Sequence, residues 1–531
     1  MAPSWVASVA KSSASSGSGP LRELKSTLAL TNSGASPHSD RSTAADLACV
    51  ISSLVLLITI CAWWLYSRDY ILYYGDAQAH LNISRSVIDS RTPGYDQLGT
   101  VWLPLLHVIC LPFVGNDWLW STGLAGTIPV AVCFVLAGTL FYLAARTVFG
   151  SRAAAAVCVS CFALNPNLLY LSAIPMTETL FLAGLAALLL AGCRFAESRN
   201  PKWFALAVAA CWLTCLTRYD GWFLIPFAAA WVAFFSTQRI KTFILFCVLA
   251  SAVSFYWFAH NWWETANALD FYNGPYSPRA IQGGKPYPGY RNLAQAIHYY
   301  FTAGRLCAGS VLLVLGLIGT ACAVRTRACI PVLFLLLTPL FYIVSMDWSG
   351  GSPIYVPVLW PNSYYNTRYG IALVPFAAFA AGALVTRMPR KWRRAAAFAL
   401  PCLTLLPWLL HPSMDNVICW KESEVNSRAR RAWTAPAASY LKANYRTGQG
   451  ITAAFGDLTS IFCRARIPLK EVLHEGNGPE WLATNKRPDL LHSNVWLISM
   501  AEHEGMAKQY EPVMSLPVRA NPTVQIYRRA H

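Results

Sequence analysis

Long apolar segments separated by short polar links make up most of the chain. They begin at about residue 45, after a stretch rich in Ser, Ala and Gly that includes "KSSASSGSGP". A helix needs about 20 mostly apolar residues to cross the hydrocarbon core of a bilayer. On this criterion the pattern predicts about eleven transmembrane helices, at residues 46–66, 122–145, 153–171, 176–194, 203–217, 222–236, 241–262, 303–324, 328–346, 370–387 and 395–411.

The links between these segments differ in charge on the two sides of the predicted bundle. Cytoplasmic loops of membrane proteins carry an excess of Lys and Arg, so basic links are expected inside. Residues 1–44 are therefore predicted to be cytoplasmic, and their Ser-, Ala- and Gly-rich composition predicts that they are disordered. An odd number of spans then places the C-terminal tail on the extracytoplasmic side. The basic links hold Arg146 and Arg152; Arg194, Arg199 and Lys202; Arg239 and Lys241; Arg325 and Arg327; and Arg387, Arg390, Lys391, Arg393 and Arg394.

Three of the opposite, outer segments are long and aromatic: residues 67–121, 263–302 and 347–369. The first contains the short, proline-broken apolar run "LPLLHVICLPFV", which suits a helix at the membrane interface better than a span. Together with the apolar segments they form a predicted transmembrane domain over residues 45–411.

Residues 412–531 have the composition of a small water-exposed domain. Within them "ITAAFGD", "NVWLISM" and "TVQIYRR" alternate or run apolar as strands do, with helical stretches between them. The sequence therefore predicts a multi-pass α-helical membrane protein with an extracytoplasmic α/β domain at its C-terminus.

Composition supports the membrane assignment. The 531 residues are 55% hydrophobic and only 13% charged, against about a quarter charged in soluble domains. The 42 Lys and Arg exceed the 25 Asp and Glu, for a net charge of +17. In a soluble protein this excess would suggest nucleic acid binding. Here many basic residues lie in short links that set topology, so membrane lipids and not nucleic acid are the expected partners.

The 16 cysteines are mostly single residues inside apolar segments. Cys158 and Cys161 form a C-x-x-C pair in an apolar run without a nearby His or second Cys pair, so we expect packing and not zinc or redox chemistry. Cys419 and Cys463 lie in the tail and could form a disulfide if the tail is exported, which the sequence leaves open.

The stretch "YYGDAQAHLNIS" directly follows the first apolar segment. It places Asp76 and His80 four residues apart, and therefore on one face of a helix. Asp76 could instead be a helix N-cap, because it follows a glycine and precedes helix-forming residues. His80 taken alone is more often a packed helix-face residue than a ligand.

Other ionisable residues also lie at the outer ends of predicted spans. They are Glu178 in "PMTETLF", Arg218 and Asp220 in "LTRYDGW", and Arg368 in "YYNTRYG". Charged groups so close to the bilayer are costly and often mark function. Each has a structural alternative: a favourable acid in a first helical turn for Glu178, a local ion pair for Arg218 with Asp220, and a snorkelling anchor for Arg368.

The order of these motifs, with "NGPYSP" and "YNTRYGIALVP", resembles the GT-C glycosyltransferases over about residues 70–385. The most similar families are the protein O-mannosyltransferases and the bacterial aminoarabinose transferases. The resemblance implies an inverting integral-membrane glycosyltransferase of the plasma or inner membrane. It would move a sugar from a polyprenyl-phosphate carrier to a lipid, glycan or protein acceptor on the outer face.

Carried over residue by residue, the resemblance makes Asp76 the catalytic acid of the first outer segment and Arg368 the basic residue near the donor phosphate. Many relatives have two adjacent acids where this chain has Gly75-Asp76-Ala77, so the resemblance does not carry a two-acid metal site. Metal ligands are therefore unassigned, and the sequence does not require a divalent cation.

The expected chemistry indicates further candidate residues. A carboxylate can take the proton from an attacking hydroxyl, and a lipid phosphate leaving group needs cationic donors. The substrate-binding candidates are Arg368, Tyr369, Glu178, His80, Arg218, Lys285, Arg279 and Arg291.

Two other function classes fit a membrane bundle. A transporter or flippase of lipid-linked sugars would be expected to place charges or broken helices near the bilayer midplane, where this sequence has few charges. A non-catalytic scaffold on the same fold is the other alternative, because fold alone does not fix function.

Overall fold

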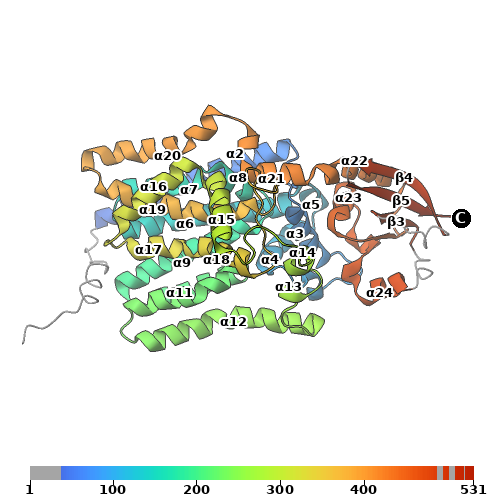
Figure 1. The fold of residues 1–531 in the computed structure, drawn as a ribbon, viewed down its shortest axis with the longest axis horizontal. Helices are drawn as coiled ribbons and strands as arrows, with labels where there is room; N and C mark the ends of the chain where they lie inside the picture. The colour runs from blue at the N-terminus through green and yellow to red at the C-terminus, as the bar shows by residue number, and fades with distance from the viewer. Residues whose placement is uncertain (1–36, 487–493, 501–508, 519–520, 531) are drawn as a thin grey trace, which may run out of the picture.

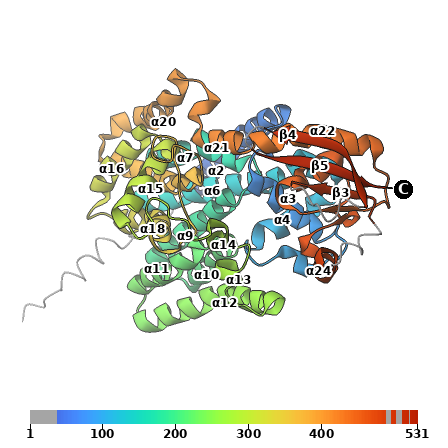
Figure 2. The ribbon, with the colours of Figure 1, turned by 45° about the vertical axis from the view of Figure 1, so that its right-hand side comes forward.

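The computed structural model describes residues 37–486, 494–500, 509–518 and 521–530. These residues form a bundle of helices with a small sheet domain at one end (Figure 1; Figure 2). The first described helix, α2, spans Pro37–Ser67 and so begins before the predicted boundary at residue 44. A helix extends readily past its apolar part, because each added residue brings one more backbone hydrogen bond. Residues 1–36, predicted to be disordered, lie outside the described residues.

Six candidate membrane spans occur among the described residues: Ala44–Ser67 in α2, Leu124–Phe149 (α6), Thr177–Ser198 (α9), Arg239–Thr265 (α12), Cys329–Trp348 and Thr367–Arg387. The fifth comprises α17 (Cys329–Leu335) and α18 (Leu337–Trp348), and the sixth comprises η2 (Thr367–Ala372) and α19 (Leu373–Arg387). Two bent helix pairs would raise the number to eight. They are α7 (Arg152–Ala163) with α8 (Pro166–Ser172), bent by 67°, and α15 (Leu293–Ala308) with α16 (Ser310–Ala323), bent by 108°.

The predicted multi-pass helical architecture is confirmed, but the count of eleven spans is not. Both bends lie where the apolar pattern continues, which is why hydropathy does not reveal them. Pro166 interrupts the first pair, and Gly309 at φ +83° separates the second. The remaining predicted spans correspond to shorter or proline-containing helices: α10 (Pro201–Cys215), α11 (Asp220–Phe235) and α20 (Arg393–Leu410).

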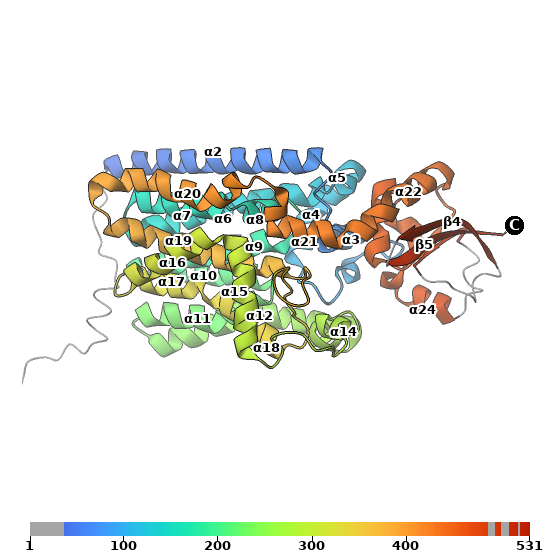
Figure 3. The same ribbon diagram turned by 45° about the horizontal axis from the view of Figure 1, so that its top comes forward.

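The helices differ in how deeply they lie in the bundle. In α9 and the span containing α19, 89% and 83% of the most apolar window is buried inside the protein, against 11% in α2 and 22% in α12. Figure 3 accordingly shows α2 along the outside of the bundle. Close packing at the centre uses small residues: a Cβ on Gly319 of α16 would lie 2.0 Å from the carbonyl oxygen of Ala380 in α19.

The first two predicted outer segments contain several short helices, whereas residues 349–366 of the third are turns and bends with one bridge between Tyr355 and Tyr365. Figure 3 shows α3, α5 and α14 at the end of the bundle that faces the sheet domain. The predicted interfacial helix is α4, which is apolar, contains Pro112 and is too short to span. The bounds are α3 Gly75–Ser86, η1 Tyr95–Leu98, α4 Leu105–Val114, α5 Asp117–Thr122, α13 Asp270–Asn273 and α14 Pro278–Gln282.

The C-terminal domain has a five-stranded mixed sheet in the order β2-β1-β3-β5-β4. Strand β1 is parallel to β2 and β3, whereas β5 is antiparallel to β3 and β4. The strands are β1 Ile451–Ala453, β2 Val472–Leu473, β3 Trp496–Ser499, β4 Tyr510–Val518 and β5 Asn521–Arg529. In the bundle, η3 Arg390–Trp392 links α19 to α20. The helical segments that follow α20 are η4 Met414–Asn416, α21 Ile418–Asn426, α22 Arg428–Asn444, η5 Gly456–Leu458, α23 Thr459–Ala465, η6 Leu469–Glu471, η7 Glu475–Asn477 and α24 Pro479–Lys486.

The three predicted strands correspond to β1, β3 and β5. The two that were not predicted have weak sequence signals. Strand β2 has only two residues, and β4 contains Pro512 and Pro517. Proline cannot donate to a ladder and is tolerated at a sheet edge, which is where β4 lies.

The cysteines carry no disulfide among the described residues. Cys158 is buried, and its thiol lies 3.6 Å from the carbonyl oxygen of Phe379, as expected for a packing residue. The tail pair is not formed: Cys419 Sγ lies 3.9 Å from Cys307 Sγ, whereas the thiol of Cys463 donates to the carbonyl of Trp120. Cys419 belongs to α21, which packs against α8 and η2, whereas Cys463 belongs to α23, which packs against α3, α5 and α22.

The predicted orientation gives a direct test. A topology reporter fused after His531 is expected to report an extracytoplasmic location, and one inserted in the Arg387–Arg394 link a cytoplasmic one, because this link is strongly basic. Cysteine labelling or a phosphatase and fluorescent-protein reporter pair measures both positions. A cytoplasmic C-terminal reporter would overturn the predicted sidedness.

Candidate functional site

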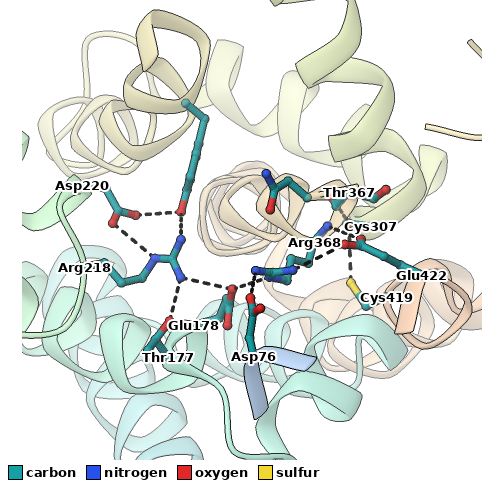
Figure 4. A network of polar contacts seen from close by, with 12 residues as sticks. Asp76, Thr177, Glu178, Arg218, Asp220, Cys307, Thr367, Arg368, Cys419 and Glu422 are labelled. Carbon is teal, nitrogen blue, oxygen red and sulfur yellow. Dashed lines mark hydrogen bonds and ion pairs between the residues drawn. The ribbon is translucent and has the colours of Figure 1, made fainter. Parts of the chain in front are cut away.

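Six charged residues from distant parts of the chain meet in one network of polar contacts (Figure 4). Two are arginines and four are acids. Most of them lie in the first turn of a helix. Asp76 comes from α3, Glu178 from α9, Arg218 and Asp220 from the α10–α11 junction, Arg368 from η2 and Glu422 from α21.

Arg368 lies among three carboxylates. Its Nη2 contacts the carboxylate of Asp76, its Nε lies 3.2 Å from Glu178 Oε1, and its Nη1 lies 3.4 Å from Glu422 Oε1. The backbone N–H of Arg368 also donates to Glu422 Oε2 at 3.2 Å. A snorkelling anchor would hold its guanidinium in interfacial water, so this interpretation of Arg368 is wrong.

Arg218 forms the second half of the network. Its Nη1 donates to Thr177 Oγ1 at 2.7 Å and to Glu178 Oε1 at 3.1 Å, so Glu178 bridges the two arginines. Its Nη2 donates to the hydroxyl of Tyr342 at 2.9 Å, and that hydroxyl donates to Asp220 Oδ2 at 2.9 Å. The predicted local pair of Arg218 with Asp220 is present at 3.3 Å, but it is only one part of a larger network.

Tyr369 lies between the two guanidinium groups. Its ring centre is 5.3 Å from the guanidinium carbon of Arg218 and 5.4 Å from that of Arg368. It also stacks on Tyr342, with ring centres 4.7 Å apart. Cation–π contact with both arginines fixes their separation without using their N–H donors.

The four carboxylates differ in their accessibility. The side chains of Glu178, Asp220 and Glu422 are 3%, 2% and 1% exposed, whereas that of Asp76 is 38% exposed. Burial raises the pKa of Glu422, and the neighbouring Arg368 opposes this rise. If all are ionised, the four acids exceed the two guanidinium groups by two negative charges. Asp76 is the carboxylate of this network that solvent or a substrate can readily reach.

The local structure around Asp76 excludes the N-cap alternative. Helix α3 begins at Gly75, its N-cap is Tyr74, and no side chain caps it. Asp76 therefore lies inside the first turn with its carboxylate on Arg368. Gly75 leaves room for Arg430, because a Cβ at this position would lie 2.9 Å from Nη1 of Arg430. Arg430 in turn donates to the carbonyl oxygens of Leu72 and Tyr73, which hold the chain that leads into α3.

A cavity of about 640 Å³ opens beside the network. Asp76 and His80 both line it, which confirms that they share one face of α3. Arg218, Asp220, Arg368 and Tyr369 form further parts of its polar end. The rest of its wall is largely aromatic and includes Trp102, Trp222, Phe223, Phe258 and Phe341.

The three basic candidates of the second predicted outer segment differ in whether they line the cavity. Arg279 lines the cavity, and its guanidinium contacts the ring of Tyr272 at 5.4 Å. Lys285 and Arg291 are not among the residues that line it. The backbone of Arg291 donates to the carbonyl of Asp347, and its side chain stacks on Tyr290. Glu178 also does not line the cavity; it lies behind the arginines and connects them.

His80 is buried against another imidazole. Its Nδ1 lies 2.9 Å from Nε2 of His107, and its ring lies 4.6 Å from that of Trp102. Burial lowers the pKa of His80 to about 3, and the charges of Arg368 and Arg218 contribute to this lowering. His80 is therefore neutral at physiological pH and can serve as a hydrogen-bonding group at the cavity wall.

This pKa predicts an acid-dependent loss of stability. The folded pKa of His80 lies below its usual value of 6.5, so the folded protein binds fewer protons than the unfolded protein. The contribution of neutral His80 to the free energy of unfolding is fully present above pH 6.5. It is lost as the pH falls toward 3, by about 1.4 kcal/mol per pH unit. The thermal unfolding midpoint should therefore fall more steeply from pH 6.5 to 5 in the wild type than in His80→Gln. Equal slopes would contradict this assignment.

No group of three or more His, Cys, Asp or Glu side chains that could hold a metal ion occurs among the residues that the structure describes. The acids nearest to Asp76 in the network, Glu178 and Glu422, are engaged by Arg368.

Three residues of the network were not predicted from the sequence: Glu422, Tyr342 and Thr177. Glu422 lies in "CWKESEV", directly after the last apolar segment, as Asp76 does after the first. This position after an apolar segment is the same signal that identified Asp76 as a candidate. Tyr342 lies within an apolar run, where a tyrosine alone indicates only packing. Thr177 is adjacent to Glu178 and is distinguished only by its contact with Arg218.

Comparisons with known proteins agree with this architecture. The family model described as dolichyl-phosphate-mannose-protein mannosyltransferase matches residues 119–263. No curated protein sequence matches the chain. The structure is similar to that of ArnT from Cupriavidus metallidurans bound to undecaprenyl phosphate, with a TM-score of 0.58 and 12% identity over 90% of this chain and 98% of that chain. It is also similar to ArnT from the same organism in the apo state, with a TM-score of 0.56 and 13% identity over the same shares of the two chains.

The match to the family model and the two structural similarities agree with the resemblance that the order of the motifs predicted, and the structural similarities show that the chain has the fold of ArnT. The structural match extends over 90% of this chain, so it includes at least part of the C-terminal domain as well as the bundle.

Proposed function

We propose that this chain, which has the fold of the GT-C superfamily, is an integral-membrane glycosyltransferase of the hexosyl- or mannosyl-transferase type. Its donor would be a sugar linked to a polyprenyl phosphate, and its acceptor a hydroxyl presented at the outer face of the membrane. The observation that carries the proposal is the position of Asp76: an accessible carboxylate at the polar end of a cavity, in contact with an arginine.

In this proposal Asp76 acts as the general base. Its carboxylate takes the proton of the acceptor hydroxyl while the hydroxyl oxygen forms a bond to the anomeric carbon of the donor sugar. The bond between that carbon and the phosphate oxygen breaks at the same time, and the polyprenyl phosphate leaves with the electron pair. Attack opposite to the leaving group inverts the configuration at the anomeric carbon.

Arg368 is the proposed phosphate-binding residue. A guanidinium has five N–H donors, and the three carboxylates around Arg368 can take one each. Two donors then remain for phosphate, which guanidinium binds well in a bidentate geometry. Arg279, on the cavity wall, is a second cation that would stabilise the charge of the leaving group.

The aromatic wall of the cavity supports a lipid donor. Trp222, Phe223 and Phe258 offer apolar surface next to the arginines, as an isoprenoid chain attached to a phosphate would require. The similar ArnT structure is described as bound to undecaprenyl phosphate. This is the reason for choosing a polyprenyl carrier over a nucleotide sugar.

The test is transfer by the purified full-length protein in lipid. Radiolabelled polyprenyl-phosphate sugars are supplied with candidate lipid, glycan and peptide acceptors. Labelled product and released polyprenyl phosphate are measured, and transfer should form them in equal amounts. Movement of the labelled lipid across vesicles without product would favour a transporter. Binding without turnover across the donor panel would favour a scaffold.

A further inference from the structure

Glu422 joins the C-terminal segment to the charged network. It lies on α21, the first helix after the bundle, and its carboxylate contacts both the guanidinium and the backbone N–H of Arg368. Its side chain is 1% exposed. Burying a carboxylate is unfavourable unless it is paired, so a purely structural role would be served at lower cost by an apolar residue.

Other contacts already hold α21 in place. The hydroxyl groups of Ser423 and Tyr170 lie 2.7 Å apart, and the backbone N–H of Cys419 donates to Asn167 Oδ1 at 2.9 Å. The ring of Trp420 packs against that of Tyr70, with centres 5.5 Å apart. Docking of the helix therefore does not depend on the charge of Glu422.

The charge of Glu422 acts instead on Arg368. Three carboxylates already share this guanidinium, and a lipid phosphate would bring further negative charge to it. Like charges in a partly desolvated site repel each other strongly. Each carboxylate near Arg368 thus weakens the binding of phosphate, and Glu422 does so without lining the cavity or contacting a substrate there.

We propose that Glu422 is a positioning residue that holds part of the Arg368 guanidinium and limits how tightly it binds lipid phosphate. The C-terminal segment thereby sets the release of the spent polyprenyl phosphate carrier. This rests on the proposed function, in which that phosphate is the leaving group. A site with two uncompensated arginines would retain its anionic product, and the excess of carboxylates prevents this.

The test measures binding of undecaprenyl phosphate to the full-length protein in nanodiscs. Glu422→Gln and Glu422→Met remove the charge and keep a similar volume. Both are expected to bind about tenfold more tightly than the wild type, which corresponds to about 1.4 kcal/mol. Turnover should be lower in both, and added undecaprenyl phosphate should inhibit it at lower concentrations. Ser423→Ala is the matched control: it removes a docking hydrogen bond of α21 and leaves Arg368 untouched, so its affinity should stay within about twofold of the wild type.

A loosened helix would weaken binding, so the sign of the change separates the two roles. Unchanged or weaker binding in the folded Gln or Met variant would overturn the proposal. Failure of both neutral variants to fold, while Ser423→Ala folds, would make Glu422 a structural tether and would also overturn it. Absence of binding by the wild type would instead contradict the proposed function itself.

Discussion

Asp76→Asn is expected to lower turnover by about a hundredfold or more while the protein stays folded. Asparagine has nearly the same shape and can still accept a hydrogen bond from Arg368, but its amide cannot take a proton from the acceptor hydroxyl. Asp76 is the accessible acid of the network and does not cap α3. The substitution therefore removes no capping hydrogen bond from the start of this helix. Initial rates of sugar transfer and the thermal unfolding midpoint measure the two effects separately.

Asp69→Asn provides the matched control for this variant. Asp69 precedes α3 by a few residues and is well exposed, and its carboxylate pairs with Arg464 in the C-terminal domain. Its removal should change turnover by less than about twofold, because surface ion pairs contribute little. Normal turnover in Asp76→Asn would remove Asp76 from the mechanism. Asp220, which also lines the cavity, would be the next carboxylate to test.

Arg368→Lys is expected to weaken binding of undecaprenyl phosphate and to lower turnover, each by roughly tenfold to a hundredfold. Lysine keeps the charge but has no planar fork, so it cannot meet a phosphate and three carboxylates at once. Charge-assisted hydrogen bonds of this kind contribute about 1.5–3 kcal/mol each. Binding to the protein in nanodiscs and steady-state turnover measure the two quantities.

Arg368→Ala should have a larger effect and should also destabilise the protein. It leaves buried Glu178 and Glu422 without their shared cation, and breaking a buried ion pair on one side costs about 3–5 kcal/mol. The lysine variant is therefore the cleaner test of function. Arg291→Lys is the matched control, since Arg291 lies on an outer segment but does not line the cavity. Wild-type affinity and turnover in Arg368→Lys would assign phosphate binding to Arg279 or Arg218 instead.

The membrane-protein class, the position of the C-terminal domain in the chain and most residues of the charged network follow from the sequence. Apolar runs and basic links are local properties of the sequence. A helix that crosses lipid must be apolar along its length, and the loops that join such helices carry the basic residues. Asp76, Glu178, Arg218 and Arg368 could be identified because charged residues are rare in such a chain and each stands at the end of an apolar segment. The motif order then indicated the fold, and the structure is similar in fold to ArnT.

Tertiary structure decided what these residues do to one another. The number of spans depended on bends at Pro166 and Gly309 that leave the apolar pattern intact, and on the short or proline-containing helices α10, α11 and α20. The contact of Glu422 with Arg368 depended on α21 folding back on η2, which joins residues far apart in the chain that no local pattern connects. The difference between accessible Asp76 and its buried neighbours arises in the same way, because accessibility is a property of the surrounding packing and not of residue type.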